Sequence, residues 1–121
     1  MLTINDVTLL YQEGVEVKLR RKPHPQKLKG DYDPSHLVIS IFISEIVSEC
    51  EFGLTLLHEF IHARDDHNGS LERSADNDKA VEAEARRTYS ENRPVLALIR
   101  ELYQIRDFAD YKNRRQSTSL Q

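Results

Sequence analysis

The fold of this chain is decided by residues 51–64, which read EFGLTLLHEFIHAR. Apolar side chains occur at nearly every position around a helix in this segment, so it is predicted to be an interior α-helix over Glu51–Arg64. The same segment contains His58, Glu59 and His62 in the pattern His-Glu-x-x-His. Three ionisable groups in an otherwise apolar helix are costly to bury without partners. The segment is therefore predicted to form the centre of the core and to carry the functional site.

The two histidines have the spacing of a metal site. His58 and His62 are four residues apart, so they lie one above the other on one helix face and can hold the same ion. Zinc with three protein ligands keeps a position for water and lowers the pKa of that water toward about 7. Glu59 points about 100° away around the helix, where it can take the proton of this water and pass it to a leaving amine.

These residues predict a Zn²⁺ cofactor with Glu59 as the general base. The alternative is a metal-free pair of core histidines beside a salt-bridged glutamate. A third ligand is required, and we expect it to be Glu82, which lies beside the apolar face of the next predicted helix. Glu84 falls further around that helix, on the expected solvent side. His67 is a rival, but the chain would have to turn sharply directly after the motif helix to bring it back.

The flanking segments predict an α+β fold in which a small, mostly antiparallel N-terminal sheet packs on the motif helix. Runs of β-branched and apolar residues predict strands, and Glu13-Gly14 would join the first two as a hairpin. The predicted strands are Val7–Gln12, Val15–Arg20 and Leu37–Ile43, and Lys27–Ser35 is expected to be a loop. After a loop over Asp65–Asp78, helices are predicted from Asn77 or Asp78 to Ser90 and from Pro94 to Tyr111.

Length and composition indicate one soluble domain. The chain has 121 residues and a net charge of −3, which gives no long-range attraction to nucleic acid or to an anionic membrane. Cys50 is the single cysteine, so no intrachain disulfide is expected. The N-terminus lacks a secretory pattern and no run approaches the roughly 20 apolar residues of a membrane span. We expect a cytoplasmic domain over residues 1–112, followed by a loose tail over residues 113–121.

The string from Leu56 to Ala63, followed about twenty residues later by Glu82-Ala83-Glu84-Ala85, resembles the gluzincin clan of zinc metallopeptidases. The likeness covers about Leu37–Tyr89, and the small size is similar to the minigluzincins and to the catalytic core of the ImmA/IrrE-type peptidases. The resemblance implies a zincin-like fold, a peptide or protein substrate, and Glu82 as the glutamate ligand from a second helix. The position four residues after Glu82 is Arg86, where many relatives have an aspartate that supports a zinc histidine.

The resemblance also implies a role for the strand before the motif helix. In the clan this strand forms the sheet edge that pairs with an extended peptide, so Leu37–Ser44 is expected to be that edge. Minigluzincins are associated with latent forms in which a C-terminal segment blocks the cleft, and the tail over residues 113–121 is expected to act likewise. The oligomeric state is left open, a homodimer included.

Two other functions are compatible with the same residues. One is a regulatory or binding module that keeps the zinc site with little catalysis, and the other is a purely structural zinc site. For a peptidase, several side chains are candidates to stabilise the oxyanion of the transition state. They are Tyr89, Tyr103, Tyr111, His67 and Arg93.

Overall fold

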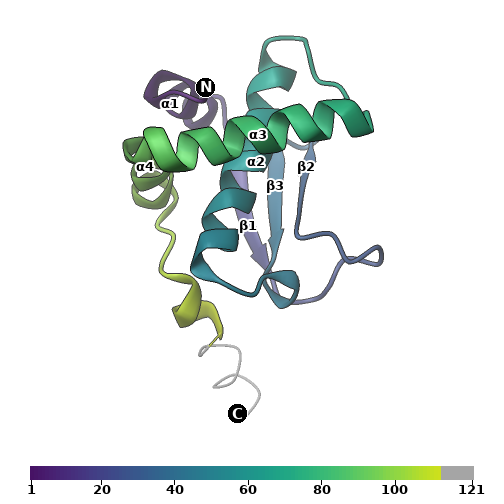
Figure 1. Cartoon of the computed structure of the whole chain (residues 1–121), viewed down its shortest axis with the longest axis vertical. Coiled ribbons are helices and arrows are strands. Elements are labelled where there is room, and N and C mark those ends of the chain that lie inside the picture. The colour runs from purple at the N-terminus through teal and green to yellow at the C-terminus, as the bar shows by residue number, and fades with distance from the viewer. Residues whose placement is uncertain (113–121) are drawn as a thin grey trace.

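The computed structural model describes residues 1–112 of the chain. Its elements confirm the predicted α+β class, with the sheet in the N-terminal half and long helices in the C-terminal half (Figure 1). The predicted tail, with its expected inhibitory role, lies outside the described residues. In chain order the elements are α1 (Ile4–Gln12), β1 (Glu16–Arg20), β2 (Gly30–Asp33), β3 (Val38–Phe42), a 3-10 helix η1 (Ile43–Glu45), α2 (Glu49–His67), α3 (Ala75–Glu91) and α4 (Arg93–Tyr103).

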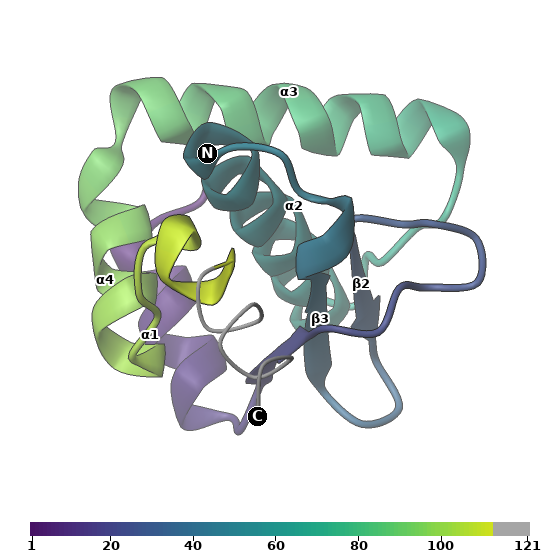
Figure 2. The same cartoon turned by 90° about the horizontal axis from the view of Figure 1, so that it is seen from below.

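The motif helix α2 is the central element of the core. The side chain of Ser48 caps its N-terminus by accepting a hydrogen bond from the backbone N–H of Glu51. The helix contacts β2 and β3 as well as α1, α3 and α4, and it lies between α3 and the sheet (Figure 2). All of its large apolar side chains except that of Leu54 are therefore fully buried, which confirms the predicted interior helix. The buried ones are Phe52, Leu56, Leu57, Phe60 and Ile61.

The sheet is mixed, and its strand order is β1-β3-β2. The prediction of a mostly antiparallel sheet is therefore correct for one of the two strand pairs: β2 pairs with β3 antiparallel, whereas β1 pairs with β3 in parallel. The strand predicted over Leu37–Ile43 is confirmed as β3, but it is the middle strand and has a partner on both sides. Its expected role as the substrate-binding edge is wrong, and the edge beside α2 is β2, within the segment predicted as a loop.

The N-terminal hairpin is absent because residues 7–12 belong to a helix. Thr3 and Asp6 form a capping box: each side chain accepts a hydrogen bond from the backbone N–H of the other residue. Such a reciprocal cap satisfies two N–H groups at the start of a helix. Val7 and Leu10, three residues apart, then face the core. Gly14 adopts a positive φ of 91° in the turn that leads from α1 into β1.

The C-terminal helices begin and end at other residues than predicted. α3 begins at Ala75, earlier than expected, because the side chain of Ser74 caps it by accepting from the backbone N–H of Asn77. α4 ends at Tyr103, because Gln104 adopts a left-handed conformation. The early start has a functional consequence, since it places Asp78 inside the first turn of α3 rather than at the boundary between loop and helix.

Within residues 1–112, none of the helices combines the length and the apolar composition that a bilayer crossing requires.

Candidate metal centre

The two motif histidines face each other on α2. Their Nε2 atoms are 3.2 Å apart, one helical turn from each other. His62 is almost completely buried, whereas the side chain of His58 keeps 19% of its exposure. Burial lowers the pKa of His62, and the neighbouring charges of His58 and Arg73 lower it further. His62 is therefore held as a neutral imidazole at neutral pH, which is the form that binds a metal.

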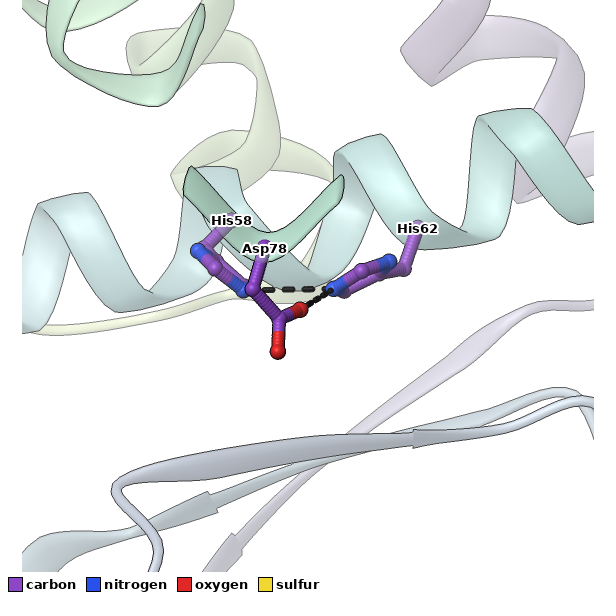
Figure 3. A group of neighbouring side chains, drawn as sticks. All are labelled: His58, His62 and Asp78. Atoms are coloured by element: carbon purple, nitrogen blue, oxygen red, sulfur yellow. Dashed lines mark hydrogen bonds and ion pairs between the residues drawn. The ribbon is translucent and has the colours of Figure 1, made fainter. Parts of the chain in front are cut away.

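The residue that joins the histidine pair is Asp78 of α3. Its Oδ1 lies 3.4 Å from Nε2 of His62, and Figure 3 shows the three side chains converging. One ligand atom from each of His58, His62 and Asp78 lies within 4.8 Å of the others, so this group could hold a metal ion. In a tetrahedral zinc site two ligand atoms are about 3.3 Å apart. The separations of 3.2 and 3.4 Å around His62 therefore suit zinc.

Glu82, the predicted third ligand, touches the other nitrogen of His58. Its Oε2 lies 3.0 Å from Nδ1, whereas Nε2 of His58 is the atom that faces His62. The remaining carboxylate oxygen of Glu82 lies 3.3 Å from the guanidinium of Arg86, one turn further along α3. Glu82 is thus close to the site but outside the group of three, and its role as a ligand stays a prediction.

The two rival ligands lie away from the pair. Glu84 forms a two-pronged ion pair with Arg64 of α2, and its side chain is 17% exposed. Its expected position on the solvent side is therefore wrong, because α2 covers this side of α3. His67 is the last residue of α2 and is exposed, so it belongs to neither a loop nor the metal group.

The predicted general base, Glu59, is buried beside the histidines, with 5% of its surface exposed. Burial raises the pKa of Glu59 to about 8, and the negative charge of Asp31 adds to this effect. The edge strand passes directly over its carboxylate at Gly30. A Cβ atom at Gly30 would lie 2.8 Å from Cγ2 of Thr55 and 3.0 Å from Oε2 of Glu59. Only glycine allows the strand to come so close to the helix at this point.

The site opens into a cleft of about 730 Å³. Its lining combines charged side chains, among them Lys29 and Arg86, with apolar ones such as Leu28 and Leu54. The site residues that reach it are His58, Glu59 and Glu82, and Gly30 lines it from the edge strand. The cleft therefore provides a concave space beside the buried carboxylate in which a ligand can be held.

The predicted oxyanion donors do not meet at this site. The hydroxyl of Tyr103 donates to the backbone carbonyl of Val15, and that of Tyr111 accepts from the backbone N–H of Arg106. Arg93 lies over the ring of Tyr89, 5.8 Å from its centre. None of these four side chains lines the cleft.

Arg73 is a cation near the site that sequence reasoning did not consider. Its guanidinium donates a hydrogen bond to the backbone carbonyl of Tyr32 on β2. Its charge also lowers the pKa of both Glu59 and His62. This opposes the larger effect of burial on Glu59 and adds to the larger effect of burial on His62. Nothing in the sequence near Arg73 signals this position, because it depends on how the loop before α3 crosses the end of β2.

No family model, curated protein or solved structure matches this chain. The resemblance to zinc peptidases therefore rests on the motif residues themselves.

Asp78 was also not predicted as a site residue, although the sequence contains two signals for it. Ser74 followed by Asn77 is a helix start, which places Asp78 inside the helix. Asp78 and Glu82 are then four residues apart, so both face α2 from the same side of α3.

Proposed function

We propose that this chain is a zinc-dependent peptidase with a zincin-like arrangement of sheet, motif helix and carboxylate-bearing helix. The observation that carries the proposal is the pair of Nε2 atoms 3.2 Å apart, accompanied by a carboxylate of α3 and adjacent to a buried glutamate. His58 and His62, with one carboxylate of α3, would hold the ion. A bound zinc ion supplies a water of lowered pKa and polarises a peptide carbonyl.

Glu59 is the proton-transfer residue in this proposal. Its carboxylate lines the cleft next to His58, so a water in the cleft lies within its reach. In its ionised form, which the charge of a zinc ion bound beside it would favour, Glu59 accepts a proton from this water and later returns the proton to the leaving amine. A purely structural zinc site needs neither a base nor an open cleft. The burial of Glu59 in the cleft wall thus favours the catalytic function over the structural one.

The edge strand β2 suits an extended peptide. The carbonyl of Lys29 accepts from the backbone N–H of Phe42 on β3, and hydrogen-bonding direction alternates along an antiparallel strand. The backbone N–H and carbonyl of Gly30 and Tyr32 therefore face away from β3. Arg73 already binds the carbonyl of Tyr32, so a peptide would add to β2 at the Gly30 end, which lines the cleft.

The test compares the full chain with its Glu59→Gln variant on an unstructured protein substrate, with zinc present. Glu59→Gln should lower kcat by about 10²–10⁴-fold, because the proton acceptor is lost, while the zinc content stays at the wild-type level. Glu101→Gln makes the same chemical change at an exposed position of α4 and should leave activity unchanged. Wild-type protein that binds zinc yet cleaves nothing would favour a binding module. Equal cleavage by the wild type and Glu59→Gln would contradict the assigned mechanism.

A further inference from the structure

We infer that Asp78 supplies the carboxylate ligand of this centre and that Glu82 is a positioning residue that orients His58. The inference rests on the proposed zinc site, and it reverses the roles that the sequence predicts for α3.

The position of Asp78 is that of a ligand. Its Oδ1 approaches His62 at Nε2, the same atom that faces Nε2 of His58. These three atoms lie within 4.8 Å of one another, and the two separations at His62 are close to the edge of a zinc tetrahedron. Nδ1 of His62 is buried without a hydrogen-bond partner among residues 1–112, so Nε2 is the nitrogen of this ring with neighbours suited to an ion.

The position of Glu82 is that of a support. Its carboxylate meets His58 at Nδ1, 3.0 Å away, and the two nitrogens of an imidazole point in different directions. An ion at Nε2 is therefore not reached by a carboxylate bound at Nδ1. A carboxylate that accepts the Nδ1–H fixes the tautomer in which Nε2 has its lone pair free, and it makes that nitrogen a better ligand.

The order of residues along α3 supports both roles. Asp78, Glu82 and Arg86 follow one another at intervals of four, so they form one row on the helix. The first meets His62, the second meets His58, and the third pairs with the second. Arg86, with no counterpart in the expected pattern, is then the cation that balances the charge of Glu82. The ligand lies one turn nearer the start of α3 than the sequence suggests.

Metal titration of the full-length protein separates the two roles without any activity measurement. Metal-free wild type, Asp78→Asn, Glu82→Gln and Asp76→Asn are titrated with Co²⁺, whose visible absorption depends on its ligands, and with Zn²⁺ against a chromophoric chelator. Asp76→Asn is the matched control, because Asp76 lies in the same first turn of α3 and outside the metal group. Both aspartate variants remove one charge from the same helix end, so any effect on the helix dipole is shared.

We expect Asp78→Asn to change the Co²⁺ absorption and to lose more zinc affinity than Glu82→Gln does. Glu82→Gln should keep the wild-type absorption and lose about 10- to 100-fold in zinc affinity, and Asp76→Asn should match the wild type. The Asp78 side chain is 58% exposed, so its substitution should leave the metal-free melting temperature unchanged. Should Asp78→Asn prove destabilised, Asp78→Glu keeps a carboxylate and is expected to retain more zinc affinity than Asp78→Asn.

The inference is overturned if Glu82→Gln alters the absorption, or if Asp78→Asn behaves like Asp76→Asn. Both of these outcomes leave the proposed function in place, with Glu82 or another residue as the third ligand. A wild-type protein that binds neither ion would instead remove the proposed function itself.

Discussion

Glu82 and Glu84 are two residues apart on α3, yet they serve different neighbours. Glu82 lines the cleft and touches His58, whereas Glu84 is turned toward Arg64 of α2. Burial by itself would raise the pKa of Glu84, but the hydrogen bonds and charge of Arg64 outweigh burial and hold this pKa below its usual 4.5. The pair therefore joins α2 to α3 on the side of the helices away from the metal group.

This pairing predicts a pH-dependent contribution to stability. Above pH 4.5 Glu84 is ionised in both states and the folded protein holds the charge better, so the contribution is complete. As the pH falls below 4.5, Glu84 of the unfolded chain binds a proton first, so the contribution to stability shrinks. It is completely lost once Glu84 of the folded protein is protonated too. We expect Glu84→Gln to cost about 1.5 kcal/mol at pH 7 and much less at pH 3, measured by urea unfolding with chelator present.

Exposed Glu91 provides the control for this measurement. Glu91→Gln on the same helix should change the free energy of unfolding little at either pH. Because Glu84 takes no part in the metal group, Glu84→Gln should keep the wild-type zinc content. A cost that is equal at pH 7 and pH 3 would show that the ion pair with Arg64 does not stabilise the fold.

At the scale of the element, the start of α3 decides which carboxylate reaches the histidines. The hydroxyl of Ser74 accepts from the backbone N–H of Asn77 and so fixes the first turn, which includes Asp78. Without this cap the first turn frays, since its N–H groups have no other partner within the helix. A metal ligand in the first turn is therefore more sensitive to capping than one in the middle of α3.

We expect Ser74→Ala to cost about 1 kcal/mol of stability and to weaken zinc binding as well, although Ser74 is outside the metal group. Ser74→Asp keeps a capping oxygen and should preserve both properties. Ser90→Ala, near the other end of α3, removes a side-chain hydrogen bond to the helix backbone and serves as control. Zinc affinity by chelator competition and urea unfolding check the expectation. Unchanged zinc affinity in Ser74→Ala would mean that the first turn of α3 is not part of the site.

For the whole molecule, a bound ion would cross-link two helices, α2 and α3, which follow one another in the chain and are joined there by residues 68–74. His58 and His62 come from α2 and Asp78 from α3, so the complete ligand set exists only in the folded chain. A ligand that binds the folded state alone stabilises it by about 2.7 kcal/mol at a concentration 100 times its Kd.

We therefore expect zinc at this concentration to raise Tm by about 10 °C over the chelated protein. Thermal unfolding followed by circular dichroism measures the shift, and Mg²⁺ serves as control, because this hard ion prefers oxygen ligands in an octahedron. The double variant His58→Ala with His62→Ala should lose the zinc-dependent shift. A shift of the same size in that variant would place the stabilising zinc elsewhere.

The parts of this protein that follow from local pattern were predictable from its sequence. The interior helix that carries His58, Glu59 and His62 follows from apolar residues on all its faces, and β3 follows from a short β-branched run. The side-by-side histidines follow from the helical repeat alone. In each case the deciding interactions lie within one segment, so no knowledge of its neighbours is needed.

Tertiary structure alone decided the strand order and the surroundings of the carboxylates. β2 contains Gly30 and two aspartates, a poor strand by composition, and it forms because it pairs with β3 and packs its buried Tyr32 on α2. The contrast between Asp78 at His62, Glu82 at His58 and Glu84 at Arg64 depends on how α3 crosses α2. Side chains from two helices meet according to the angle and offset at which the helices pack, and neither helix encodes that geometry by itself.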